Sequence, residues 1–232
     1  MNKNLKNSLK RLWSGWVKPV VLTLAVITPI KSSLADYNQV PTGSMKPTIL
    51  EGDRILVNKL AYDLKFPLTT WHIAQWGDPQ RGDIVVCYSP IDGTRLVKRV
   101  VAIPGDTIAM HNSRLLINGT PASYTPLDPA VAKLIPEEEQ PAHLLAEECV
   151  DGFSHAMMLT PAIPSRRSFA EISVPEAQYF LMGDHRDNSM DSRFFGFVER
   201  EQIIGKASTV VASFDPDHYH FPRKNRWLEK LR

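Results

Sequence analysis

The feature of the sequence that most constrains the fold is a series of short apolar runs separated by glycine, proline and aspartate. RILVNK, IVVCY and LVKRVVAI are such runs, rich in valine and isoleucine and too short for most helices. Runs of this kind, bounded by turn residues, are typical of β-strands. The sequence therefore predicts a mainly β fold, with strands at residues 54–59, 84–88, 96–103, 115–117, 179–182 and 207–212.

The turns between these runs carry a recurrent Gly-Asp pair, at residues 52–53, 82–83, 105–106 and 183–184. Glycine adopts the positive φ of a tight turn, and an aspartate side chain accepts hydrogen bonds from nearby backbone amides. We interpret the first three pairs as turns. The fourth pair opens the charged segment GDHRDNSMDSR, which turn chemistry alone does not explain.

The N-terminal region has the charge pattern of a membrane segment. Basic residues precede an apolar stretch at 12–30 that Lys18 alone interrupts. A helix of that length, at about 1.5 Å per residue, reaches about 28 Å, close to the hydrocarbon thickness of a bilayer. We expect one N-terminal transmembrane helix, with residues 1–31 forming a cytoplasmic N-terminus and anchor and the later residues outside. The alternative is a cleavable signal peptide ending at Ser33-Leu34-Ala35, because the unbroken apolar part is short.

The remaining chain divides by composition. Residues 118–175 are rich in proline and polar residues, and we expect them to form a loop-rich inserted subdomain. They interrupt a catalytic β domain made of residues 32–117 and 176–214. Residues 215–232 form a basic C-terminal tail, expected as a charged helix that faces water.

Overall charge and cysteine content exclude several classes of protein. The chain has 27 basic and 25 acidic residues, a balance that argues against nucleic acid as a partner. Two cysteines exclude a disulfide scaffold and a four-cysteine zinc site. We interpret Cys87 as a buried strand residue, and a bridge from it to Cys149 stays open.

A candidate nucleophile lies in the segment PTGSMKPT, a few residues after the apolar stretch. Ser44 needs a base to take its proton, and a lysine serves only if its amine is neutral. In a strand Lys98 shares a face with Leu96 and Val100, whereas Arg99 points to the other side. Lowering an amine pKa from about 10.4 to neutrality needs about 4 kcal/mol, within the range of desolvation. The alternative is a strand lysine whose amine reaches water.

Five motifs together resemble the bacterial signal peptidase I family: VPTGSMKPT, GDRILVNK, RGDIVV, KRVVAIPGD and GDHRDNSMDSR. The resemblance implies the β-fold of signal peptidase and LexA-like catalytic domains, with no metal or organic cofactor. It implies a serine endopeptidase that cuts signal peptides of secreted preproteins after small residues at P1 and P3. It also implies membrane lipid as a partner and a place in the bacterial cytoplasmic membrane, with the catalytic domain on the outer side.

The resemblance also assigns roles to residues. Ser44 is the expected nucleophile, Lys98 the general base, and the Ser44 backbone N–H and the Thr42 hydroxyl the oxyanion hole. Ser189 is expected to hydrogen-bond the lysine amine. Asp191 and Arg193 are expected to form an ion pair beside the site, sharing a face if the segment is extended.

Substrate selection is expected from small apolar pockets that admit alanine-sized side chains. The resemblance assigns their walls to Val40, Met45, Ile49, Leu96 and Val97. The substrate would bind as an added β-strand, so that backbone hydrogen bonds supply affinity and the pockets supply selection. The aromatic segment 66–76 is a further hypothesis: either part of it enters the membrane interface, or it packs on its own domain.

Competing interpretations stay open. His185 stands where the family usually has asparagine, so it could form a triad with Ser44 and Asp184 or Asp187. The function could be that of a specialised conjugation-system peptidase that processes a pilin, with the same dyad and fold. A self-cleaving repressor of the LexA kind should carry a DNA-binding helix-turn-helix instead of a membrane segment. The last alternative is an inactive membrane scaffold.

Overall fold

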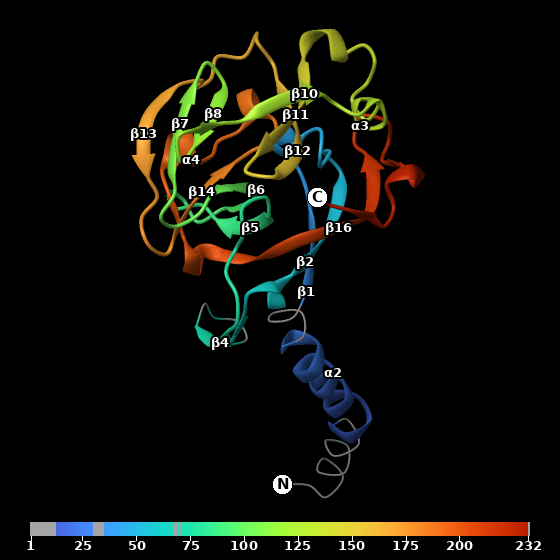
Figure 1. Cartoon of the computed structure of the whole chain (residues 1–232). Helices are drawn as coiled ribbons and strands as arrows, with labels where there is room; N and C mark the ends of the chain where they lie inside the picture. Colours follow the sequence, from blue (N-terminus) through green and yellow to red (C-terminus); the bar gives the residue numbers. More distant parts are fainter. Residues whose placement is uncertain (1–12, 30–34, 67–68, 70, 232) are drawn as a thin grey trace, which may run out of the picture.

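The computed structural model describes residues 13–29, 35–66, 69 and 71–231 of the 232-residue chain. Within them the protein is mainly β, built around one curled sheet (Figure 1). The strand order of this sheet is β1-β2-β16-β5-β6-β14-β15, and neighbouring strands are antiparallel. The strands are β1 (Ala35–Gln39), β2 (Asp53–Asn58), β5 (Ile84–Tyr88), β6 (Arg95–Ala102), β14 (Gln178–Met182), β15 (Val198–Glu199) and β16 (Ile203–Asp215).

The core of the protein covers both faces of this sheet at its centre. Ile84 and Val86 of β5 belong to one buried cluster, and Val85 and Cys87 belong to another. Because successive strand residues point to opposite faces, the two clusters lie on the two sides of β5. Register shifts in β16, which pairs with both β2 and β5, bend the sheet between them.

Two smaller sheets pack beside the central one. The first has the order β13-β7-β8-β9, and its buried residues share a cluster with Phe180 of β14. The second has the order β10-β11-β12. Their strands are β7 (Thr107–His111), β8 (Arg114–Ile117), β9 (Thr120–Pro121), β13 (Phe169–Ser173), β10 (Ser123–Pro126), β11 (Leu144–Val150) and β12 (Phe153–Leu159).

The remaining elements are short. A separate hairpin joins β3 (Asp63–Lys65) to β4 (His72–Gln75). The helical elements are η1 (Trp13–Val17), α2 (Lys18–Pro29), η3 (Gly43–Met45), η4 (Lys59–Ala61), α3 (Pro129–Ala132), η5 (Gln140–Ala142), η6 (Arg186–Asn188), α4 (Ser192–Phe195), η7 (Arg200–Gln202) and η8 (Lys224–Arg226).

The expected mainly β fold is confirmed, and every strand expected from the apolar runs has a counterpart: β2, β5, β6, β8, β14 and β16. Strand β1 has no such signal because ADYNQ lacks an apolar face, and only pairing with β2 makes it a strand. Cys87 is buried as expected. Both cysteines are free, so the bridge that stayed open is not formed.

Residues 118–175 contain more regular structure than a loop-rich segment. They hold β10, β11 and β12, whereas β9 and β13, from the same range, pair with β8 and β7. The hairpin between β11 and β12 turns at Asp151 and Gly152, which have φ of 51° and 78°. An Asp-Gly pair between two apolar runs is a strong hairpin signal, so the sequence could have predicted this turn.

Most of the C-terminal tail is exposed, as expected, but it forms short strands instead of the expected helix. Strands β17 (Phe221–Pro222) and β18 (Glu229–Lys230) pair with β16. Arg226 is buried, with Nη2 at 2.8 Å from Asp53 Oδ2 and 3.0 Å from the Thr48 carbonyl oxygen. A buried guanidinium is stable only beside such partners, so this contact holds the tail against the sheet.

The segment expected to be an anchor is helical where the structure describes it, in η1 and α2. Figure 1 shows α2 projecting from the β body at the end where β4 lies. Among the described residues no helix combines the length and the apolar character that a bilayer crossing requires. Leu12 and Ile30, the two ends of the expected span, lie outside the described residues.

Candidate active site

The turn that carries Ser44 is fixed by main-chain bonds and by its own apolar residues. After β1, Val40 N–H donates to the Asp53 carbonyl oxygen at 2.9 Å, and Ile49 N–H donates to the Met45 carbonyl oxygen at 2.9 Å. Met45 and Ile49 are fully buried in the cluster that β2 and β5 also supply. Residues 43–45 form the turn η3, which is buried and contacts both β6 and η6.

Strand β6 brings Lys98 to this turn. Lys98 pairs with Val85 of β5 in the sheet register, and its side chain is 3% exposed. Its Nζ lies 2.8 Å from Ser44 Oγ and 3.1 Å from the Val97 carbonyl oxygen. Leu96 and Val100 pack together in one cluster, so Lys98 lies on the apolar face that strand alternation predicts.

The surroundings of Lys98 favour the neutral amine. Burial lowers the pKa of Lys98, and Arg193 acts in the same direction. Asp191, Cys87 and Asp184 oppose this shift by attracting the charged form. A neutral amine 2.8 Å from a serine hydroxyl can accept the hydroxyl proton through its lone pair. The pair can therefore generate a nucleophilic serine without a histidine.

Asp191 and Arg193 form the expected ion pair, although the local backbone is not extended. Arg193 Nε and Nη2 each lie 2.8 Å from a carboxylate oxygen of Asp191, and both side chains are buried. Asp191 is the N-cap of α4, so the two residues meet across the first turn of a helix. The Asp191 carboxylate also accepts from the Arg193 N–H at 3.2 Å and from the Gly183 N–H at 3.0 Å, and the second bond ties α4 to the end of β14.

Ser189 lies close to Ser44 but makes no hydrogen bond to Ser44 or Lys98. Its hydroxyl is buried and has no hydrogen-bond partner among the described residues, so the expected bond to the Lys98 amine is not formed in this structure. Gly183 lies between the two serines: a Cβ there would collide with the Ser44 carbonyl oxygen and with Ser189 Oγ. The neutral Lys98 amine has two N–H groups. One of them donates to the Val97 carbonyl oxygen, and the second remains available as a donor.

His185 does not form the alternative triad with Ser44 and Asp184 or Asp187. Its Nε2 lies 2.7 Å from the Thr160 hydroxyl. Within the described chain Asp184 is bonded to Arg99 and Thr48, and Asp187 to Arg167 and Ser165, so neither carboxylate orients the imidazole. Burial lowers the pKa of His185 to about 4.

Four of the five residues expected to select the substrate pack beside the Ser44 turn. Val40, Met45 and Ile49 are buried in one cluster, against which Val97 packs. Leu96 packs on the opposite side of β6, with the other cluster. Thr42, the expected second donor of the oxyanion hole, is exposed and immediately precedes η3.

Sequence reasoning missed two buried ion pairs near this site. Arg99 Nε and Nη2 lie 2.8 Å and 2.7 Å from the two oxygens of Asp184, and both residues are buried. Arg186 and Glu148 form a second buried pair, between η6 and β11. A signal for the first pair was present, because an arginine on a buried strand face needs a carboxylate and the Gly-Asp pair at 183–184 supplies one.

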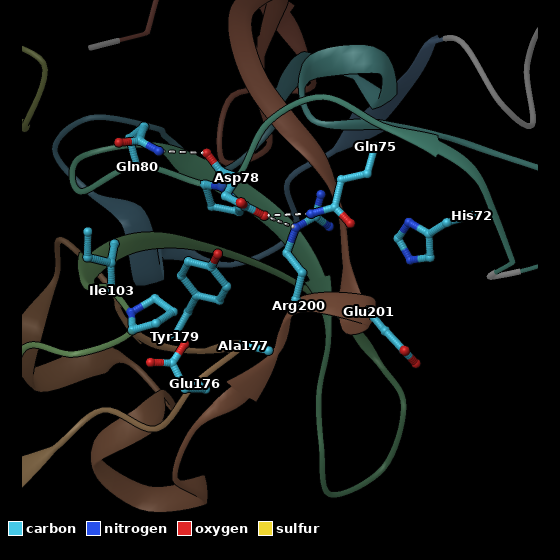
Figure 2. Close-up of a pocket in the computed structure, with 12 residues that line it drawn as sticks. His72, Gln75, Asp78, Gln80, Ile103, Glu176, Ala177, Tyr179, Arg200 and Glu201 are labelled. Carbon is cyan, nitrogen blue, oxygen red and sulfur yellow. Dashed lines mark hydrogen bonds and ion pairs between the residues drawn. The ribbon is translucent and has the colours of Figure 1, made fainter.

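A separate cavity of about 540 Å³ lies away from this site. It is lined by residues of the β4 region, of the turn after β6 and of η7, and none of the predicted site residues lines it. Figure 2 shows the Arg200 guanidinium beside the Asp78 carboxylate in this cavity, and their Nε and Oδ1 atoms are 3.1 Å apart. Across the described residues no group of three His, Cys, Asp or Glu side chains could hold a metal ion.

A serine bonded to a buried lysine on a mainly β scaffold defines a class of serine hydrolases in which lysine replaces histidine as the base. The family model for signal peptidase, peptidase S26, matches residues 13–212. The chain belongs to this family of peptidases.

Three relatives are similar to this chain over most of its length. The signal peptidase I of Pseudomonas fluorescens is 35% identical, with 88% of this chain and 74% of the relative covered. The signal peptidase I of Buchnera aphidicola subsp. Schizaphis graminum is 33% identical, over 86% of this chain and 75% of the relative. The signal peptidase I P of Bacillus subtilis subsp. natto is 32% identical, over 86% and 89%. A solved signal peptidase I from Enterococcus faecalis is 28% identical, covers 56% of this chain and 97% of its own, and has a TM-score of 0.34.

Proposed function

We propose that the protein removes N-terminal signal peptides from secreted preproteins by acyl-enzyme catalysis, with Ser44 as nucleophile and Lys98 as general base. The observation that carries the proposal is the 2.8 Å contact between Ser44 Oγ and a lysine amine that is buried and has a lowered pKa. The serine hydroxyl gives its proton to the neutral amine as Oγ attacks the scissile carbonyl carbon. The Lys98 ammonium then protonates the leaving amine, and the first product departs.

Deacylation follows the same path in reverse. Lys98, neutral again, takes a proton from water as the water oxygen attacks the acyl-serine carbonyl. The ammonium then returns a proton to Ser44 Oγ when the ester bond breaks. In both steps negative charge develops on the carbonyl oxygen, and we assign its stabilisation to the Ser44 backbone N–H and the Thr42 hydroxyl. Each such donor contributes about 3 to 4 kcal/mol when it is already aimed at that oxygen.

The proposed specificity is for small side chains at P1 and P3. Val40, Met45, Ile49, Leu96 and Val97 surround the Ser44 turn and the strand that carries Lys98, and such aliphatic walls fit alanine-sized groups. Ser189, Asp191 and Arg193 are proposed to support the dyad, with the ion pair between Asp191 and Arg193 holding α4 beside it. A bound substrate strand would use backbone hydrogen bonds, which every preprotein offers.

The arrangement of the chain supports a division of labour. We propose that residues 32–117 and 176–214 form the catalytic domain, that 118–175 form an inserted subdomain and that 215–232 form a tail. We also propose that residues 1–31 are a cytoplasmic N-terminus and an anchor in the bacterial cytoplasmic membrane, with membrane lipid as a partner. The basic residues before an apolar stretch and the exposed Trp13 and Trp16 support this placement.

The test is cleavage of a preprotein with an Ala-x-Ala site by purified wild-type and variant chains. Ser44→Ala is expected to lose activity by roughly 10⁴-fold or more, because the acyl-enzyme cannot form. Ser89→Ala is the matched control: Ser89 is 7% exposed and Ser44 is 9% exposed, but the Ser89 hydroxyl accepts from the Ile91 N–H in the turn between β5 and β6, and its variant should keep full activity. Equal processing by wild type and Ser44→Ala would reject the mechanism, and an inactive wild type would indicate a scaffold.

A further inference from the structure

A chain of hydrogen bonds connects the inserted region with the Ser44 turn. Thr160 follows β12, and its hydroxyl lies 2.7 Å from His143 Nδ1 and 2.7 Å from His185 Nε2. The backbone N–H of His185 in turn donates to the Ser44 carbonyl oxygen at 3.1 Å. Thr160 and His185 are buried, whereas His143 is half-buried. The three side chains and the main chain of His185 thus form a continuous path from the edge of the insertion to the candidate nucleophile.

Proton counting shows what this path requires. A hydroxyl has one proton, so Thr160 can donate to only one of the two imidazoles and must accept from the other. With both imidazoles neutral, each carries one N–H, and both bonds are satisfied together. A second proton on the accepting ring would leave two donors facing one hydroxyl. The Thr160 hydroxyl therefore couples the tautomers of the two rings and holds the ring of His185 at its Nε2 atom.

The main chain reinforces the same connection. Met158 N–H donates to the Asp184 carbonyl oxygen at 2.9 Å, and Thr160 N–H donates to Asp187 Oδ2 at 2.8 Å. The end of β12 therefore holds the segment that includes His185 from one side. That segment contacts Ser44 from the other side, where Gly183 leaves room for the Ser44 carbonyl oxygen. A displacement of His185 would be passed on to the turn that carries the nucleophile.

Burial, with the charges around His185, keeps the imidazole neutral. Burial is the largest influence on its pKa, which falls to about 4, and His143 and Lys46 act in the same direction. The Gly43 carbonyl and Asp187 oppose them. At neutral pH the ring is therefore a hydrogen-bonding group without charge, suited to holding a turn and unsuited to storing a proton.

We propose that His185 is a positioning residue for Ser44 and that Thr160 and His143, from the inserted region, fix its ring. The proposal rests on the peptidase function proposed for Ser44 and Lys98. In this arrangement the insertion is part of the catalytic apparatus, since it supplies two of the three side chains that hold the turn. In the described residues none of the three side chains is hydrogen-bonded to the Ser44 hydroxyl or the Lys98 amine, and the effect on catalysis passes through the geometry of the serine and lysine pair.

The test compares Thr160→Val, which removes the hydroxyl at nearly constant volume, with Thr160→Ser, which keeps it. Full-length variants are assayed on a preprotein for kcat, KM and the pH dependence of kcat, with thermal unfolding to count folded molecules. Thr160→Val is expected to lower kcat roughly tenfold with KM within about twofold, because a small misplacement of a reacting group costs rate. Its acid limb should move to higher pH, since a loosened serine bond stabilises the neutral amine less. Thr160→Ser should restore both quantities.

His143→Ala removes the outer end of the path and should lower kcat about threefold, a smaller loss because the bond between Thr160 and His185 remains. Wild-type kcat and an unmoved pH profile in Thr160→Val would overturn the proposal. A Thr160→Val defect that Thr160→Ser fails to rescue would also overturn it, because it would indicate an effect of packing alone. An unchanged kcat in His143→Ala would exclude His143 from the positioning role. Ser44→Ala distinguishes a failure of the peptidase mechanism from a failure of the positioning role. An active Ser44→Ala protein would reject the peptidase mechanism. An inactive Ser44→Ala beside a normal Thr160→Val would reject only the positioning role.

Discussion

Among single residues, Lys98 determines the pH range in which the proposed chemistry can run. Its burial lowers the pKa of the amine, and only the neutral form can take the serine proton. Activity is therefore present above the lowered pKa and lost as pH falls through it, where the amine gains a proton. The wild-type profile of kcat, measured from about pH 5 to about pH 10, should show this acid limb. Lys98→Arg should be inactive throughout, because guanidinium keeps its proton.

The control for this experiment is Lys206→Arg. Lys206 is a partly exposed lysine that forms an ion pair with Asp83, and arginine can replace it there without loss of charge. Its variant should follow the wild-type profile. A wild-type rate that is flat across the whole range, or an active Lys98→Arg enzyme, would contradict the role of a neutral amine.

Gly183 offers a second test at the scale of one residue. A methyl group there would meet the Ser44 carbonyl oxygen and the Ser189 hydroxyl, so Gly183→Ala must shift one of the two serines. We expect a destabilisation of about 1 to 3 kcal/mol, as for overpacking elsewhere in protein cores. The loss of kcat should be larger, roughly 100-fold, because the nucleophile turn moves. Unfolding in urea and steady-state kinetics measure the two effects.

Gly77→Ala is the matched control. A Cβ at Gly77 would have the Ala61 carbonyl oxygen as its nearest neighbour at 3.8 Å, an ordinary contact. Gly77 also has no positive φ, so the added methyl causes no backbone strain. Its variant should match the wild type in both measurements. If Gly183→Ala behaved like Gly77→Ala, the close approach between β14 and the Ser44 turn would not matter for catalysis.

How far the sequence predicts these contacts depends on their separation along the chain. Strand alternation alone placed Lys98 on an apolar face, because that rule is local. The pairing of Asp191 with Arg193 was expected, but through an extended backbone, since the sequence does not reveal that Asp191 caps a helix. The contacts of Thr160 with His143 and His185 had no signal at all. They join positions 17 and 25 residues apart through tertiary packing, and no motif contains Thr160.

At the scale of elements, the pair formed by Glu148 and Arg186 joins the inserted sheet to the catalytic loop. Glu148 lies on β11 and Arg186 in η6, both side chains are buried, and Arg186 Nη1 lies 2.9 Å from Glu148 Oε1. Glu148→Gln leaves the buried guanidinium without a counterion, so the free energy of unfolding should fall by about 3 to 5 kcal/mol. Denaturant unfolding of the full chain measures this change.

Glu51→Gln serves as the comparison, because Glu51 pairs with Lys46 at 3.7 Å near the surface. Exposed pairs contribute about 0 to 1 kcal/mol, so this variant should differ little from wild type. Similar losses in the two variants would mean that the insertion is not fastened to η6 through this pair.

The same pair explains why the inserted sheet was missed. Strand β11, LLAEECV, carries two glutamates, and a run with two charges resembles an exposed loop. In the fold Glu148 is buried because Arg186, from a distant element, neutralises it. A polar residue that is buried by a remote partner hides the apolar alternation on which strand prediction depends. In the central sheet β6 also carries buried charges, Lys98 and Arg99, but the apolar residues on both sides of them kept the local pattern recognisable.

At the scale of the whole molecule, one group of exposed aromatic and apolar residues lies at one end. Trp71 and Trp76, with Phe66 and Ile73, are exposed on or beside the hairpin of β3 and β4. Figure 1 shows this hairpin at the end of the β body from which α2 projects. Of the two hypotheses for this segment, insertion into a membrane interface fits these exposed side chains better than packing on the domain, since apolar patches on soluble surfaces usually mark contact sites.

Contact between the hairpin and the membrane predicts a different change in KM for a membrane-embedded substrate than for a free peptide. If the hairpin rests in the interface, Trp71→Ser combined with Ile73→Ser should raise KM roughly tenfold for a preprotein embedded in vesicles, since losing buried apolar area weakens the contact. With a short peptide in detergent the same variant should match the wild type, because no membrane has to be met. Tyr219→Ser is the control, since Tyr219 is 94% exposed in the loop between β16 and β17. Equal KM values for all three proteins on vesicles would place the hairpin in water, and the exposed aromatic residues would then need another partner.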